Sequence, residues 1–213
     1  MKKFHPVLIV AVILAAAFII CGPSPAADKK APPPDYFPLQ VGNWWSYKMV
    51  ESGNEFMIKV TGKEKIGDVE CFKVETVAAN DKVMFTEYYS KPPGKVMVLR
   101  QIFNTANMTA DYNPVRHFLN NPLKVGDTWT WKGKGMMDVE TEETKKVEKV
   151  ETVEVPAGKF SAAKVPSTEI KSGTETKKEY WYADHVGMVK STTDTGSVKS
   201  TVVLVKYNVK GGK

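Results

Sequence analysis

The side chains that could do chemistry are few in this chain. There are two cysteines, Cys21 and Cys71, and the histidines beyond the first ten residues are His117 and His185. Neither histidine has a His or Cys partner at metal-ligand spacing, so the sequence predicts no metal site. Because Cys21 lies beside a leader-like segment, we expect no disulfide within the chain. Cys71 then stands alone, and we interpret it as a buried strand residue, with a free reactive thiol as the alternative.

Catalysis would need a nucleophile beside a base. Asp184 and His185 form an adjacent acid–imidazole pair in a predicted turn between Tyr182 and Val186, but no nucleophile accompanies them. The chain also lacks a nucleophile elbow, a zinc-protease helix motif, a phosphate loop and a dinucleotide fingerprint. We therefore expect no enzymatic activity, no catalytic residues and no cofactor, with a hydrolase as the minor alternative.

The N-terminus has the pattern of an export signal. Lys2 and Lys3 precede an unbroken apolar run over residues 7–20. That run is too short for a membrane span of about 20 residues, but it fits the apolar part of a signal peptide. We assign residues 1–20 to a signal peptide, or residues 1–26 if cleavage follows Ala26.

Cys21 followed by Gly22 is the candidate lipidation site. The residue before it is Ile20, whereas lipoproteins usually carry a small residue there, and Ser24 with Ala26 offers a rival small-x-small site. Both cuts stay open, with an uncleaved anchor as a third case; the mass of the mature N-terminus would tell them apart. The chain would be periplasmic or a membrane-anchored lipoprotein, with the outer membrane favoured if Cys21 is acylated.

Proline-rich sequence follows over residues 21–35, with five prolines and no large apolar side chain. Such a composition predicts a semi-rigid tether between the signal and the folded part. The rest of the chain is ordinary for a globular protein, with 42% apolar and 25% charged residues. Its charges of both signs are interleaved, and only two of the 30 basic residues are arginine, so we expect no nucleic-acid partner.

One motif occurs twice. Residues 38–48 read Pro-Leu-Gln-Val-Gly-Asn-Trp-Trp-Ser-Tyr-Lys, and residues 122–132 read Pro-Leu-Lys-Val-Gly-Asp-Thr-Trp-Thr-Trp-Lys, an offset of 122 − 38 = 84. A glycine turn precedes an alternating aromatic strand in each copy, which predicts core tryptophans at Trp45 and Trp129. Residues 179–181 similarly match residues 87–89. The spacing predicts a tandem duplication.

Short alternating segments with polar turns fill both halves, which predicts an all-β fold. We expect a curved antiparallel sheet, an open barrel or a sandwich, built from two tandem β-meander repeats with little helix. The predicted single β domain spans residues 36–209, with repeats over 36–104 and 121–209. A bridge over residues 105–120 would be irregular and then helical from Pro114, because Asn113 with Pro114 resembles a helix start.

The charge-rich segment 145–155 is expected to form a solvated hairpin, and residues 210–213 a disordered tail.

Four stretches together resemble the TapB-type family, namely residues 37–47, 88–89, 154–160 and 180–188. The resemblance implies an exported bacterial β-rich protein, in many members a lipoprotein, without an assigned activity. It implies no catalytic residues.

The function expected first is a non-enzymatic cell-envelope protein that binds or scaffolds a partner protein, with the membrane reached only through a lipid anchor at Cys21. The alternative is a periplasmic carrier of an apolar ligand. Methionines could line the cavity of such a carrier, although the sequence does not identify the ligand-binding residues. They are Met49, Met57, Met84, Met97, Met137 and Met188.

Overall fold

The computed structural model describes Met1 and residues 32–210. Residues 33–210 belong to one compact unit. Its described residues contain thirteen β-strands, a single 3-10 turn and no α-helix. The elements are β1 (Trp44–Met49), β2 (Glu55–Ile66), β3 (Val69–Ala78), β4 (Val83–Ser90), β5 (Lys95–Phe103), β6 (Met108–Asn120), β7 (Thr128–Lys134), η1 (Met136–Asp138), β8 (Glu140–Lys146), β9 (Lys149–Val155), β10 (Gly158–Lys171), β11 (Thr174–Ala183), β12 (Gly187–Asp194) and β13 (Lys199–Asn208).

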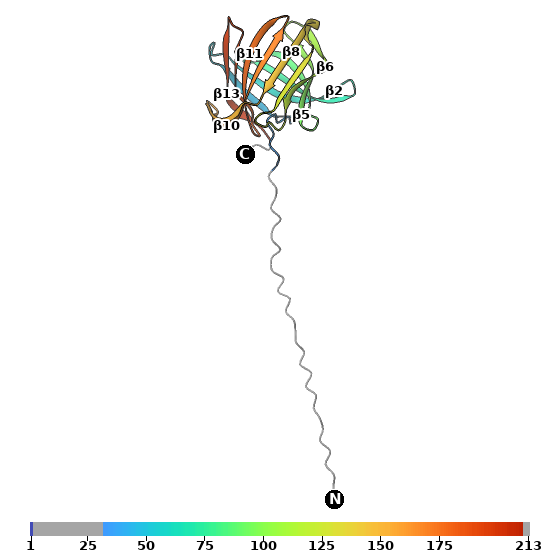
Figure 1. Ribbon diagram of the computed structural model, residues 1–213, viewed down its shortest axis with the longest axis vertical. Helices are drawn as coiled ribbons and strands as arrows, with labels where there is room; N and C mark the ends of the chain where they lie inside the picture. The colour runs from blue at the N-terminus through green and yellow to red at the C-terminus, as the bar shows by residue number, and fades with distance from the viewer. Residues whose placement is uncertain (2–31, 211–213) are drawn as a thin grey trace. The chain divides into compact units, whose positions relative to one another are not determined.

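All neighbouring strands are antiparallel, and the sheet closes on itself (Figure 1). Strand β10 makes the closure: residues 162–171 pair with β11 on one edge. On its other edge, residues 167–171 pair with β8 and residues 158–164 pair with β9. Twelve strands therefore form the ring, and β9 is an additional strand beside it. The predicted curved antiparallel sheet is confirmed, with a closed barrel in place of an open one.

The irregular and then helical structure predicted for the bridge over residues 105–120 is wrong. Residues 108–120 form the long strand β6, which pairs with β5 from Lys95 to Phe103 and touches β7 through Asn113 opposite Lys134. The Asn113–Pro114 signal fails because the segment has a partner on each side, so the backbone makes ladder hydrogen bonds instead of a helical turn. The structure gives this peptide bond a cis geometry.

The two copies of the repeated motif make the same backbone hydrogen bonds. Gly42 and Gly126 have φ of +93° and +95°, a region that favours glycine. The Gly42 amide donates to the Val60 carbonyl at 2.9 Å, and the Gly126 amide donates to the Val147 carbonyl at 2.9 Å. The chain thus enters β1 and β7 by the same turn, as the repeat predicts for these two positions.

A second pair of matched contacts lies farther along the two halves. The Tyr88 hydroxyl of β4 donates to Glu64 Oε2 at 3.1 Å, and the Trp181 Nε1 of β11 donates to Glu151 Oε1 at 2.8 Å. Each aromatic residue also lies opposite a lysine on the preceding strand of the sheet. These matched contacts support the tandem duplication, which stays a prediction for the chain as a whole.

The sequence match of residues 179–181 to residues 87–89 is wrong by one position. Tyr88 and Trp181 occupy equivalent places, so the offset in this region is 181 − 88 = 93. By the same register Glu87 is the counterpart of Tyr180. The Glu-Tyr dipeptide common to both segments misleads the alignment, because side chains alternate between faces and a one-residue slip exchanges them.

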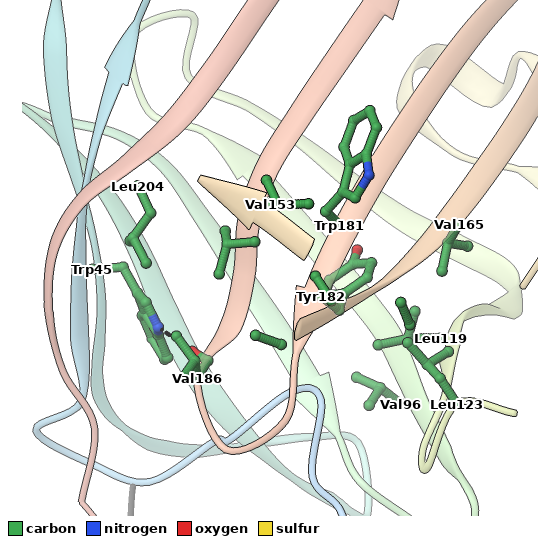
Figure 2. Packing of buried hydrophobic residues seen from close by; sticks show 14 of the residues in the cluster. Trp45, Val96, Leu119, Leu123, Val153, Val165, Trp181, Tyr182, Val186 and Leu204 are labelled. Atoms are coloured by element: carbon green, nitrogen blue, oxygen red, sulfur yellow. Dashed lines mark hydrogen bonds between the residues drawn. The ribbon is translucent and has the colours of Figure 1, made fainter. Parts of the chain in front are cut away.

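The main core lies inside the closed sheet. It contains Trp45, Trp129, Val96, Leu119 and Leu204, each at most 7% exposed. The Trp45 indole is fixed at its polar end by a hydrogen bond from Nε1 to the Val186 carbonyl at 2.6 Å (Figure 2). Both motif tryptophans are therefore buried anchors, as the sequence predicts.

Cys71 belongs to a separate, smaller apolar cluster with Tyr88 and Leu99. Its side chain is fully buried, and burial raises the pKa of its thiol. A buried thiol with a raised pKa is a weak nucleophile. These observations agree with the buried strand residue expected from the sequence rather than with the reactive thiol.

Both ends of the predicted domain need small corrections. Asp35, assigned to the tether, makes hydrogen bonds and an ion pair with the barrel. Lys210, assigned to the tail, donates its backbone amide to Asn43 Oδ1 at 3.0 Å and its ammonium to the Val41 carbonyl at 3.2 Å. The composition around Asp35 and Lys210 is typical of a linker or a tail, but each of these residues makes specific hydrogen bonds with the barrel.

We expect Trp45→Ala and Trp129→Ala each to lower the free energy of unfolding by about 3–5 kcal/mol, the range for emptying a large aromatic site in a core. Chemical denaturation of both variants measures this. Trp44→Ala is the matched control, because the Trp44 side chain is only partly buried. A loss no larger than that of the control would show that neither indole is a core anchor.

A fragment of residues 36–104 is expected not to melt cooperatively. It would keep β1 to β5 but lose β13 from one edge and β6 from the other, and exposed edges in a small sheet disfavour a stable monomer. Circular dichroism with thermal melting tests this against residues 33–210. A cooperative melt of the monomeric fragment would contradict the prediction that one domain spans both halves.

Candidate ligand-binding site

A cavity of about 200 Å³ lies inside the barrel, and aromatic and aliphatic side chains form most of its wall. They come from β1, β2, β3, β4, β6, β11 and β12 and from the chain before β1. The lining residues are Phe37, Pro38, Leu39, Trp45, Tyr47, Ile58, Val74, Glu87, Tyr89, Phe118, Tyr180, Tyr182, Gly187 and Met188. Glu87 is the only one with an ionisable carboxyl group.

Residues 35–39, which we call the capping segment, close one end of this cavity. Phe37 packs against Tyr89 with ring centroids 5.1 Å apart and against Phe118 at 5.4 Å. Pro38 and Leu39 also line the cavity. The segment directly before the first strand is therefore part of the binding site.

Asp35 fixes the capping segment to three different turns. Its carboxylate accepts hydrogen bonds from Lys91 Nζ at 2.6 Å and from Asn121 Nδ2 at 2.8 Å. Its backbone amide donates to Asp184 Oδ1 at 2.7 Å, and its carbonyl accepts from the His185 amide at 2.7 Å. Burial would raise the pKa of Asp35, but hydrogen bonds and the charge of Lys91 lower it overall. The carboxylate therefore stays ionised and anchors the segment.

This arrangement gives Asp184 and His185 a structural position. They form the turn between β11 and β12, and His185 Nδ1 lies 2.7 Å from Asp184 Oδ1. Both residues hold the capping segment through Asp35, as described above. The plain turn expected from the sequence is present, and the pair contacts no nucleophile there.

Strand direction gives the depth of each side chain in the cavity. Strands β4 and β11 both end at the turns that hold Asp35. Side chains two residues apart on one face lie roughly 6.5 Å apart along a strand. Tyr89 and Tyr182 therefore lie near the capping segment, and Glu87 and Tyr180 lie one step deeper.

The four cavity tyrosines differ in their hydrogen bonds. Tyr47 donates to the Met188 carbonyl at 2.8 Å, and Tyr89 donates to Glu87 Oε2 at 3.0 Å. The hydroxyls of Tyr180 and Tyr182 have no hydrogen-bond partner among residues 32–210. Their rings stack at 5.9 Å, and Tyr182 is only 1% exposed. Burial raises the pKa of both groups far above neutrality, so both remain protonated.

Glu87 is a partly buried carboxyl group in an otherwise apolar wall. Burial raises its pKa, although the hydrogen bond from Tyr89 and the charge of Arg116 oppose that shift. Gln101 Nε2 donates to its other oxygen at 3.3 Å. An ionisable group in a cleft with a raised pKa is a functional-site candidate, because burying it costs stability.

Beside the cavity lies a charged cluster centred on Glu143, whose side chain is 1% exposed. Arg116 donates to Glu143 Oε2 through Nη2 at 2.9 Å and through Nε at 3.1 Å. Lys145 Nζ lies 3.2 Å from Glu143 Oε1. Burial would raise the pKa of Glu143, but the charges of Lys145 and Arg116 lower it to about 2. Glu143 is therefore ionised near neutral pH.

Lys145 links this cluster to the cavity wall. Its ammonium donates to the Phe118 carbonyl at 2.8 Å and lies 4.4 Å from the Phe118 ring and 5.8 Å from the Tyr180 ring. Burial lowers the pKa of Lys145 to about 8, with Glu143 opposing the shift. The solvated hairpin expected for this charge-rich segment is therefore wrong at Lys145, which faces inward and is 1% exposed.

Several sequence-predicted residues lie elsewhere. Cys21, the candidate lipidation site, is outside the described residues. His117 is not in the cavity wall; its ring lies 5.8 Å from the Trp129 ring in a tilted arrangement, and burial lowers its pKa. Of the six methionines named above, only Met188 lines the cavity.

Glu87, Arg116 and Glu143 are site residues that the sequence did not predict. For Glu87 a signal was available, since it shares one strand face with Phe85 and Tyr89. Within residues 32–210 no three His, Cys, Asp or Glu residues are grouped so as to hold a metal ion. That same part of the chain has no helix of the length and apolarity needed to cross a membrane.

Comparison with known proteins gives a partial family match. Residues 105–204, from the turn before β6 to within β13, match a model described as DUF3108-like. The match spans 204 − 105 + 1 = 100 of 213 residues, so it covers the second half of the chain. The TapB-type resemblance is not confirmed by it. No curated protein matches the chain significantly.

Two solved structures are similar in fold. One, from Bacteroides fragilis, is named an exported protein with a YmcC-like fold; it is 17% identical, with a TM-score of 0.51 over 82% of this chain and 99% of that one. The other, from Parabacteroides distasonis, is named a lipoprotein; it is 16% identical, with a TM-score of 0.47 over 83% of this chain and all of that one. The chain is thus similar over its second half to the DUF3108-like family and in fold to the first of these structures.

Proposed function

We propose that this chain is an exported cell-envelope protein that binds a small, mainly apolar ligand inside its barrel. The observation that carries the proposal is the aromatic cavity closed by the capping segment. The proposal adopts the carrier that the sequence offers as its alternative. The partner-binding or scaffolding role expected first stays an untested prediction, and so does the absence of enzymatic activity.

Export is supported by sequence and by analogy. The N-terminal residues have the pattern of a signal peptide, with Cys21 as the candidate lipidation site. The similar structures carry the names of an exported protein and a lipoprotein. We therefore infer that the barrel works outside the cytoplasm, as a periplasmic protein or as a lipoprotein.

The size of the cavity limits the ligand. An apolar cavity of about 150 Å³ accommodates benzene, whereas drug-sized ligands occupy pockets of about 300–1,000 Å³. A cavity of about 200 Å³ therefore fits one ring or a short acyl chain. Such a ligand would contact Ile58, Val74 and Phe118 in the wall and Phe37 in the capping segment.

Filling the cavity should abolish binding. Val74 is 4% exposed and lines the wall, so Val74→Phe would occupy the space that a ligand needs. We expect toluene to bind the wild-type protein and to bind this variant at least tenfold more weakly. The indole N–H signal of Trp45, whose side chain lines the cavity, reports binding in an NMR titration.

Val150→Phe is the matched control, because Val150 is 52% exposed. Val74→Phe is expected to lower the free energy of unfolding by about 1–3 kcal/mol. An NMR spectrum with the dispersion of a folded protein would show that the variant still folds. If toluene leaves every tryptophan signal of the wild-type protein unmoved, the cavity does not bind apolar ligands.

Glu87→Gln should raise the free energy of unfolding at neutral and alkaline pH. This would be unusual, because single substitutions typically lower it by about 1 kcal/mol. The pKa of Glu87 is raised above its ordinary 4.5, so the folded state holds its proton more tightly than the unfolded state. The unfolding free energy of the wild type then falls as pH rises from 4.5 through the raised pKa. The glutamine variant lacks this loss.

Thermal melting from pH 4 to pH 8 measures the difference, with the exposed Glu55→Gln as control. The Glu87→Gln variant should gain in Tm relative to wild type as the pH rises, and the control should not. A gain that is equal at all pH values, or absent, would mean that ionisation of Glu87 costs the fold nothing.

A further inference from the structure

Two tyrosines of the cavity wall, Tyr180 and Tyr182, have protonated hydroxyls that make no hydrogen bond within residues 32–210. Buried polar groups are nearly always hydrogen-bonded, because an unpaired one loses its hydration without compensation. Tyr180 and Tyr182 both line the cavity, and neither hydroxyl has a partner among residues 32–210. Tyr182 is 1% exposed and Tyr180 is partly buried. Within residues 32–210 the fully enclosed side-chain atoms without a partner are His117 Nε2 and Trp129 Nε1, so the two tyrosine hydroxyls are not sealed in the wall but open to the cavity. A ligand with an oxygen acceptor would satisfy both.

The neighbouring charges favour a negative acceptor. Lys145 is a buried cation and Arg116 a largely buried one, and Glu143 is a single anion between them. Glu169 and Lys178, 2.8 Å apart, cancel each other. The group therefore has one uncompensated positive charge whenever Glu87 is protonated, and in a medium of low dielectric that charge attracts an anion strongly.

Glu87 is the protein's own candidate for that anion. Tyr89 on its own strand and Gln101 on β5 donate hydrogen bonds to it, and it interacts electrostatically with Tyr112 and Arg116 on β6 and with Tyr180 on β11. Arg116 is the one cation among these groups. A second carboxylate beside ionised Glu87 would be repelled, because like charges at a buried site oppose each other's ionisation.

We propose, building on the binding function above, that the ligand is an amphiphile with a single carboxylate head that accepts hydrogen bonds from Tyr180 and Tyr182 and replaces the negative charge of Glu87. Glu87 takes up one proton from solvent as the carboxylate binds, so the net charge of the interior does not change. The apolar tail then extends from the deeper layer toward Phe37 and Leu39 of the capping segment.

Hexanoate, 1-hexanol and hexylamine are probes that differ only in the head group. NMR titration of the full-length folded protein at pH 6 should give a hexanoate affinity about tenfold above that of hexanol, since charge-assisted hydrogen bonds are roughly twice as strong as neutral ones. Hexylamine should bind most weakly, because its ammonium meets the excess positive charge. Hexanoate is ionised throughout the range from pH 6 to pH 8.

The proton uptake predicts a pH dependence. Hexanoate affinity should fall by up to tenfold per pH unit once the pH exceeds the pKa of Glu87 in the free protein, because binding then requires one proton from solvent. In Glu87→Gln the affinity should be independent of pH over this range and at least as high as in the wild type at pH 8. Hexanol should show no such dependence in either protein.

Tyr180→Phe and Tyr182→Phe test the head-group contacts. Each should weaken hexanoate severalfold and leave toluene unchanged, since only the hydroxyl is removed. Tyr88→Phe is the matched control, because Tyr88 does not line the cavity and its hydroxyl is paired with Glu64 Oε2. If Glu87→Gln does not fold, Tyr180→Phe and Tyr182→Phe still test the proposal, provided that their NMR spectra show folded proteins.

The outcomes separate the two proposals. Hexanol binding as tightly as hexanoate, or hexanoate binding without pH dependence, would overturn the carboxylate assignment while toluene binding still supported the cavity function. Tighter binding of hexylamine would reverse the inferred sign of the site. Failure of toluene and of all three probes to bind would overturn both proposals.

Discussion

A closed sheet must fill its interior, and twelve strands enclose a wide one. In a barrel of eight strands the interior is just wide enough for side chains to fill, and it widens about linearly with strand number. The ring of this chain has twelve strands. Its largest side chains, such as Trp45, Trp129 and Tyr182, therefore point inward, and the cavity remains where they do not meet.

The same constraint explains the buried charges. Arg116 on β6 and Lys145 on β8 are separated in the ring only by β7, and their long side chains fill interior space beside that strand. Glu143 pairs with both, and Ser167 donates to it at 3.1 Å, so its carboxylate is fully hydrogen-bonded. Removing one member of such a group would leave an uncompensated charge. The cluster thus fills space and sets the electrostatic potential at the cavity.

The sequence predicts strand periodicity well and inward charges poorly. Alternation identifies the all-β class, the glycine turns before β1 and β7 and the buried Trp45, since each depends on local residues. Closure through β10 depends on pairings between distant strands, and the strand nature of β6 depends on its two neighbours. Glu143 and Lys145 look like a solvated face because alternation shows that a face exists, but not which face is inside. Glu87 is the exception, because Phe85 and Tyr89 mark its face as apolar.

The difference between the two halves locates the site more sharply than their likeness does. Tyr88 in one half and Trp181 in the other make the same kind of contact: the polar atom of each aromatic side chain donates a hydrogen bond to a glutamate. One residue before, the chain has Glu87 in one half and Tyr180 in the other, and both face the cavity. If these two positions only filled the core, two similar apolar residues would suffice there. Placing an acid opposite a phenol instead gives the cavity one group that can change its charge and one that can only donate or accept a hydrogen bond. An interior built for packing alone has no use for that asymmetry, whereas a site that must orient an amphiphile requires it.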